Sequence, residues 1–129
     1  MVTLDDVARM MLELPEVETG ERQGRPSWSV RRKAFAWTRP FSKADIKRYG
    51  AATPPDGPIV AVRVADLGEK EAVLAAAPAG FFTIPHFDGY PAILIQLDRA
   101  EVAAVREALV DGWLCCAPPQ LVESYLQRP

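Results

Sequence analysis

The chain has 129 residues, of which 49% are hydrophobic and 25% carry a charge. This length and balance predict one globular domain over residues 1–129, large enough to bury a core without disulfides or metals. The net charge of −2, and the lack of any apolar run near the ~20 residues of a membrane span, exclude strongly basic polyanion binders and membrane-spanning proteins.

The first predicted element is a helix that begins after Thr3. Thr3 and Asp6 form an N-cap with an acid in the first turn, and Pro15 blocks the chain from continuing as a helix. The apolar positions share one helical face: Leu4, Val7, Ala8 and Met11. Residues 16–27 are polar and contain two glycines and a proline, so we interpret them as a connection.

Residues 28–38 change to the two-residue period of strands, and we interpret them as a β-hairpin. The turn of this hairpin is expected at residues 31–33, where three cations follow one another. The alternation of apolar and polar residues makes Trp28, Val30 and Phe35 candidates for the core.

The middle of the chain combines short helices with a strand. Ser42 is placed to cap a helical turn that ends at Gly50. Residues 59–64 form a predicted strand with three valines on one face. Residues 68–77 then form an alanine-rich helix, for which Asp66 is the predicted cap.

The last third of the chain carries the most hydrophobic strand-like run. A loop over residues 85–90 leads into this strand at residues 92–97. Asp98 is predicted to cap the helix that follows, whose apolar face holds Val102, Val105, Leu109 and Trp113. Pro118-Pro119 ends that helix, and residues 120–126 allow one further short helix.

The predicted element order is therefore α-β-β-β-α-β-β-α. Strands joined by short links, with helices at the ends, are typical of the α+β class. We expect two layers, with one antiparallel five-stranded sheet and helices packed on it. In that sheet, residues 28–38 and 59–64 are expected to pair antiparallel with residues 91–97.

Several short motifs along the chain resemble those of one known family. They are Leu14-Pro15-Glu16-Val17, Trp28-Ser29-Val30, Lys33-Ala34-Phe35-Ala36-Trp37, Pro85-His86-Phe87-Asp88-Gly89-Tyr90-Pro91, Trp113 and Ala117-Pro118-Pro119-Gln120-Leu121-Val122. Together they cover nearly the whole chain and resemble the MmcQ/YjbR family, although Pro119 stands where a basic residue is more usual. The resemblance implies a fold similar to that of secretion chaperones, and a DNA-binding-like protein with no assigned catalytic residues.

A basic segment over residues 31–49 is the main candidate for a binding surface. Seven cations and one acid give it a local balance of +6: Arg31, Arg32, Lys33, Arg39, Lys43, Lys47 and Arg48, against Asp45. Aromatic residues lie between the cations, a combination typical of a nucleic-acid surface in which cations contact phosphates. The alternative is a solvated hairpin and loop whose aromatic residues point into the core, and the sequence leaves both open.

His86, Asp88 and Tyr90 lie together in the loop before the last predicted strand. One hypothesis makes His86 a pH-sensitive group or a general base that Asp88 orients. The other makes His86 and Asp88 organisers of the turn, through hydrogen bonds to the backbone. We favour the second hypothesis, because no nucleophile accompanies the pair.

No motif predicts catalysis, a metal site or a cofactor. A single histidine falls short of the usual zinc ligand set, and the adjacent Cys115 and Cys116 are expected to be reduced thiols in a cytoplasmic protein. We therefore predict a small binding module and not an enzyme, which contacts double-stranded DNA through residues 31–49 without sequence preference. A protein- or peptide-interaction module with a chaperone-like role is the alternative.

Overall fold

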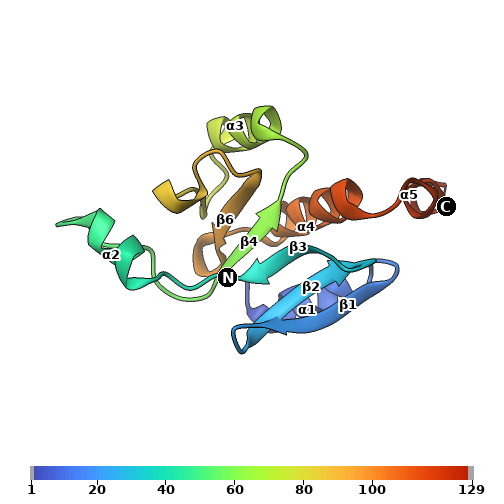
Figure 1. The fold of residues 1–129 in the computed structure, drawn as a ribbon, viewed down its shortest axis with the longest axis horizontal. Helices are drawn as coiled ribbons and strands as arrows, with labels where there is room; N and C mark the ends of the chain where they lie inside the picture. Colours follow the sequence, from blue (N-terminus) through green and yellow to red (C-terminus); the bar gives the residue numbers. More distant parts are fainter. Residues whose placement is uncertain (1, 128–129) are drawn as a thin grey trace.

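Six antiparallel strands form one sheet at the centre of the structure, a computed structural model that describes residues 2–127 (Figure 1). The strands are β1 (Val17–Arg22), β2 (Arg25–Val30), β3 (Lys33–Thr38), β4 (Ile59–Arg63), β5 (Phe81–Phe82) and β6 (Ala92–Gln96). They lie side by side in the order β1-β2-β3-β4-β6-β5. The sheet and its helices confirm the predicted α+β class, with six strands in place of the predicted five.

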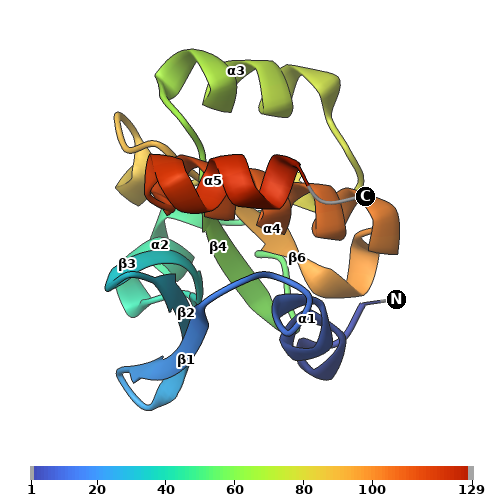
Figure 2. The same cartoon turned by 90° about the vertical axis from the view of Figure 1, so that its right-hand side faces the viewer.

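Helices cover mainly one face of this sheet. They are α1 (Leu4–Met11), α2 (Lys43–Tyr49), α3 (Leu67–Ala76), α4 (Val102–Cys116) and α5 (Pro119–Leu126), with 3₁₀ turns η1 (Pro85–Phe87) and η2 (Leu97–Arg99). Both ribbon views place α4 between α1 and α3, and α5 packs back against the same core (Figures 1 and 2). None of the helices within residues 2–127 is long and apolar enough to cross a membrane.

The predicted caps of the first two helices are confirmed. The Asp6 N–H donates to Thr3 Oγ1 at 3.1 Å, and the Thr3 N–H donates to Asp6 Oδ2 at 2.9 Å. This reciprocal pair satisfies two of the backbone N–H groups that a helix leaves without partners at its start. Ser42 and Asp45 form the same capping box before α2, and Gly50 ends that helix at a φ of 58°.

The edge strand β1 is the strand that the sequence pattern missed. Residues 16–27 were predicted as a connection, yet β1 and the first half of β2 fall within them. Each residue of β1 after Val17 is exposed, so no alternation of burial marks it as a strand. Backbone pairing with β2 holds it instead, and Gln23 and Gly24 make the turn between the two with φ angles of 55° and 77°.

The predicted cap at Asp98 is wrong. Residues 97–99 form η2, and α4 begins at Val102 after Glu101 as its N-cap. Leu97 is fully buried, and its backbone N–H donates to the Pro58 carbonyl at 3.1 Å. That contact keeps residues 97–99 beside the sheet. The helix α4 therefore starts only after the chain has left the sheet.

The predicted pairing with residues 91–97 is confirmed for residues 59–64 and wrong for residues 28–38. β4 pairs directly with β6, which sets Val60 opposite Ile95 and Val62 opposite Ile93. β3 pairs with β4, so the hairpin residues reach β6 only through that strand. α4 lies so close to β4 that a Cβ at Gly112 would sit 2.8 Å from Val62 Cγ1, which explains why glycine suits this buried helical position.

The molecule has a second, smaller core on the opposite face of the sheet, and a shift in strand register brings Trp37 to it. The register between β2 and β3 shifts between Trp28 and Ser29. As a result Phe35 and Ala36 both belong to the larger core under α1 and α4, whereas Trp37 turns to the opposite face. The smaller core forms there around Trp37, Leu94 and Phe87, and the candidate site is built on it. The predicted core residues Trp28, Val30 and Phe35 are all buried.

Candidate nucleic-acid interface

The seven cations of residues 31–49 do not form one surface. Arg31 and Arg32 make the β2–β3 turn, with φ angles of 48° and 68°, and Lys33 begins β3. Arg39 follows the other end of β3, and the remaining three cations lie on α2. At about 3.3 Å per residue, Lys33 and Arg39 are roughly 20 Å apart. The cations therefore divide into a hairpin tip and a group beyond Thr38.

At the hairpin tip, Arg31 is held by an acid of the neighbouring segment. Its Nε and Nη2 donate to the two carboxylate oxygens of Glu16 at 2.5 and 3.0 Å. These hydrogen bonds and the opposite charge raise the pKa of Arg31 and lower the pKa of Glu16. Because a carboxylate already occupies the guanidinium fork, Arg31 has little left to offer a phosphate.

A cleft of about 620 Å³ lies beyond the other end of β3, over the smaller core. The β1–β2 turn forms one wall, and there Arg22 and Arg25 stand opposite each other in the register. The residues after β3 and the loop around η1 form the rest. The lining holds three arginines and the single histidine, without Asp or Glu: Arg22, Gln23, Arg25, Trp37, Thr38, Arg39, Pro40, Phe41, Ser42, His86, Phe87 and Tyr90. We call it the arginine cleft.

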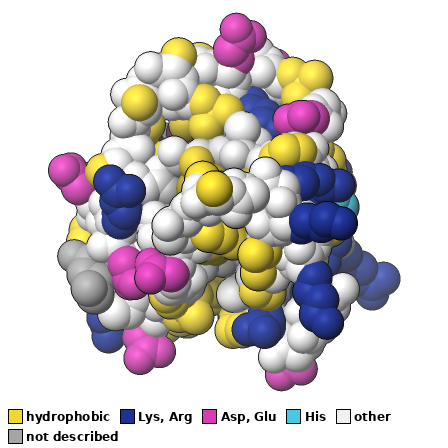
Figure 3. Space-filling view, turned by 90° about the vertical axis from the view of Figure 1, so that its left-hand side faces the viewer, with side chains coloured by type: hydrophobic (Ala, Val, Ile, Leu, Met, Phe, Trp, Pro, Cys, Tyr) yellow, Lys and Arg dark blue, Asp and Glu magenta, His cyan; other side chains and the backbone are white. Residues whose placement is uncertain are grey.

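Aromatic rings hold two arginines of the cleft in place. The Cζ atom of Arg22 lies 4.9 Å from the ring centroid of Trp37, and that of Arg39 lies 5.6 Å from the ring of Phe87. Stacking covers the face of a guanidinium but leaves its N–H edge available for acceptors. Figure 3 shows Lys and Arg side chains gathered along one edge of the molecule beside the histidine.

Arg39 is also anchored by a buried carboxylate. Its Nη2 lies 2.9 Å from Oδ2 of Asp45, a residue that is only 2% exposed. Burial raises the pKa of Asp45, but hydrogen bonds from Ser42 and Arg39 outweigh this and hold the pKa below its usual value. Neither Arg22 nor Arg25 has an ion pair with any residue from 2 to 127, so their charge faces the cleft unopposed.

The loop with His86, Asp88 and Tyr90 is organised by Lys70, a residue for which the sequence pattern predicted no role. Lys70 of α3 is buried, and its Nζ donates to the carbonyls of Phe87 at 2.6 Å and Tyr90 at 2.9 Å. Burial lowers the pKa of Lys70, and the nearby charge of Asp88 partly opposes this. A charged donor to two carbonyls fixes the turn from within.

The prediction that His86 and Asp88 organise this turn is therefore wrong. Both are exposed, and within residues 2–127 neither side chain makes a hydrogen bond. The His86 ring instead lines the arginine cleft together with Tyr90, which is 38% exposed. The cleft thus joins predicted residues Arg39, His86 and Tyr90 with two that were missed, Arg22 and Arg25. A signal for those two existed, since they flank the turn pair Gln23-Gly24.

The fold and the cleft together define a small α+β protein with a basic site at one end of its sheet. Comparisons with known proteins agree with the fold. The YjbR family model matches residues 12–115. The chain belongs to the YjbR family, which confirms the resemblance read from its motifs.

Relatives of this chain are found in mycobacteria. The uncharacterized proteins Mb2600 of Mycobacterium bovis and Rv2570 of Mycobacterium tuberculosis are each 47% identical to it, over 98% of this chain and 97% of theirs. The crystal structure of Deinococcus radiodurans protein DR2400, which has a DUF419 domain, matches 88% of this chain and 78% of its own. Its TM-score of 0.61 at 18% identity shows a shared fold.

Proposed function

We propose that this chain is a binding protein that contacts the phosphate backbone of double-stranded DNA through the arginine cleft, without reading base sequence. The observation that carries the proposal is the lining of the cleft, where three arginines and a histidine lie together and, among residues 2–127, Arg39 alone of the three arginines pairs with a carboxylate, that of Asp45. The N–H edges of guanidinium groups match phosphate oxygens in geometry as well as charge. Backbone contacts of this kind fix position on a duplex and carry no base information.

A polymer suits the surface better than a single small anion, because the basic character continues outside the cleft. Ser42, which lines the cleft, is the residue that caps α2. The exposed residues Lys43, Lys47 and Arg48 follow on that helix. Cations thus extend from the β1–β2 turn across the cleft to α2, and a backbone with evenly spaced phosphates is able to contact both ends.

The aromatic rings of the cleft favour a duplex over a single strand. Binding of single strands relies on exposed rings on which successive bases stack. Here Trp37 is 5% exposed and Phe87 is 4% exposed, and a guanidinium lies over each ring. These two rings therefore serve to position arginines, and among the Trp, Phe and Tyr rings that line the cleft Tyr90 is the exposed one on which a base could stack.

The test compares two double variants with the same change in charge. Arg22→Gln with Arg25→Gln removes two cations of the cleft, and Arg32→Gln with Lys33→Gln removes two at the hairpin tip. With three phosphate contacts, from Arg22, Arg25 and one cation of α2, the affinity of the wild type should fall with log[salt] at a slope of about −2.7, and loss of the two arginine contacts should bring the slope to about −1. Fluorescence anisotropy with a labelled duplex, from about 50 mM salt upward, measures both slopes.

We expect the cleft variant to bind at least about tenfold more weakly at low salt, and the tip variant to stay close to wild type. Equal weakening by both variants would show that only the total charge matters. Absence of duplex binding by the wild type at about 50 mM salt would end the proposal.

The alternative, a protein- or peptide-docking module, draws less support from the surface. The large exposed hydrophobic residues are spread over separate elements: Leu12, Ile46, Leu67, Tyr90, Val102 and Leu126. Docking surfaces need such residues to adjoin one another. The edge strand β1 offers free backbone groups, but it carries charged residues of the kind that discourage strand addition.

A further inference from the structure

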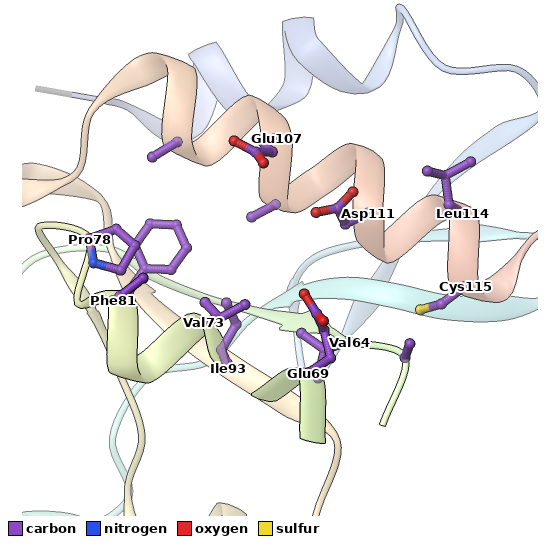
Figure 4. A pocket seen from close by; sticks show the side chains of 14 residues that line it. Val64, Glu69, Val73, Pro78, Phe81, Ile93, Glu107, Asp111, Leu114 and Cys115 are labelled. Carbon is purple, nitrogen blue, oxygen red and sulfur yellow. The ribbon is translucent and has the colours of Figure 1, made fainter. Parts of the chain in front are cut away.

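A second cavity, of about 580 Å³, lies between α3 and α4 on the helix-covered side of the sheet (Figure 4). One end of it is apolar, where Val73 of α3, Phe81 of β5 and Ile93 of β6 meet Pro78. This size falls within the ~300–1,000 Å³ of small-molecule sites, which are usually apolar with a few convergent polar groups. We call this cavity the acidic groove, after the three carboxylates that also line it.

Three carboxylates line the groove between this apolar end and the end that holds Leu114 and Cys115 (Figure 4). Glu69 comes from α3, and Glu107 and Asp111 come from successive turns of α4. Figure 4 shows Glu69 and Asp111 on opposite walls, with both carboxylates turned toward the space between the helices. None of the three has an ion pair with a Lys or Arg of residues 2–127.

All three carboxylates are exposed to solvent, and their like charges repel one another across the groove. Partial burial raises the pKa of Asp111, and the like charges of Glu107 and Glu69 raise it further. A positive group between the two walls would relieve this repulsion. A bare metal ion fits poorly, because within the described residues no three His, Cys, Asp or Glu side chains come close enough together to hold one.

We propose that the acidic groove binds an organic cation with an apolar body, of the arylalkylammonium class. The ammonium group would lie between Glu69 and Asp111, and the ring would cover Val73, Phe81 and Ile93. Charge complementarity selects the cation, and the apolar end selects a ligand with a hydrophobic body over a hydrated polyamine. The groove shares no lining residue with the arginine cleft, so amine binding and DNA binding succeed or fail independently.

Three ligands with one apolar body and different head groups test the proposal: phenylbutylammonium, phenylbutanol and phenylbutanoate. Calorimetry should show the amine binding at least about tenfold more tightly than the alcohol, with the carboxylate not binding, since only the head-group charge differs. Amide NMR shifts caused by the amine should fall on α3 and α4. Loss of the preference in Glu69→Gln with Asp111→Asn, and its retention in the charge-matched control Glu18→Gln with Glu21→Gln, would support the site.

A blocking variant separates the cavity from general electrostatics. Ala108→Phe places a ring into the groove, and it should abolish binding of both the amine and the alcohol while the fold is retained by circular dichroism. Four results would overturn the proposal: equal affinity for amine and alcohol, a preference that survives Glu69→Gln with Asp111→Asn, shifts confined to other elements, or no amine binding at millimolar concentration.

Discussion

Replacing Trp113 by alanine should lower the free energy of unfolding by about 3–5 kcal/mol, the range for a large aromatic residue removed from a core. Trp113 is fully buried, and its ring lies 4.9 Å from that of Tyr125. Its Nε1–H donates to the Pro15 carbonyl at 3.0 Å. This one side chain thus ties α4 to α5 and to the segment that follows α1. Because small domains are stable by only about 5–15 kcal/mol, the loss is a large share of the total.

Urea denaturation of Trp113→Ala and Trp113→Phe separates packing from hydrogen bonding. Trp113→Phe keeps most of the apolar ring but leaves the Pro15 carbonyl without its donor, so we expect a smaller loss of about 1–3 kcal/mol. A change below about 1 kcal/mol for Trp113→Ala would contradict the packing described for α4.

Replacing Asp45 by alanine should lower the free energy of unfolding by about 3 kcal/mol at neutral pH, because it removes one partner of a buried ion pair. The variant leaves the Arg39 guanidinium, whose side chain is 18% exposed, without its carboxylate. It also removes the acceptor of the Ser42 N–H at the start of α2. Arg39→Gln combined with Asp45→Ala should be more stable than Asp45→Ala alone, since the charge that still lacks its partner is then that of Arg48, whose side chain is 47% exposed.

The effect of Asp45 should depend on pH in one direction. Its pKa in the folded protein lies below the ordinary value of 3.8, so its contribution is complete above that value and is lost as the pH falls through the folded pKa. The stability difference between wild type and Asp45→Ala should therefore be largest above about pH 4 and shrink at lower pH. A difference that stays constant down to pH 2 would mean that the carboxylate is not held in its charged form.

The strands that sequence patterns predicted best are β4 and β6, which are buried on both faces of the sheet. Val60 and Val62 of β4 and Ile93 and Ile95 of β6 face the larger core, while their neighbours face the smaller one, so each strand stood out as a run of apolar residues. β1 escaped prediction because it is an edge strand with exposed side chains, and only its backbone pairing with β2 makes it a strand. Local capping signals were reliable where the chain turned at once into a helix, as at Thr3 and Ser42.

The candidate site was harder to predict, because tertiary pairing assembles it. The basic segment pointed to Arg39, but the β1–β2 turn carries Arg22 and Arg25 to the same place from a stretch that looked like a connection. The register shift at Trp28 and Ser29 then decides that Trp37 faces the cleft and not the larger core. The spacing of apolar and polar residues in β2 and β3 gives no sign of this register shift.

The position of bound DNA on the protein tests the central claim most directly. A short duplex added to isotope-labelled protein at low salt should shift the amide NMR signals of Arg22, Arg25, Arg39 and His86, because these residues line the arginine cleft. The signals of residues 31–33, at the other end of β3, should stay in place. Shifts centred on residues 31–33, with the cleft unaffected, would contradict the account.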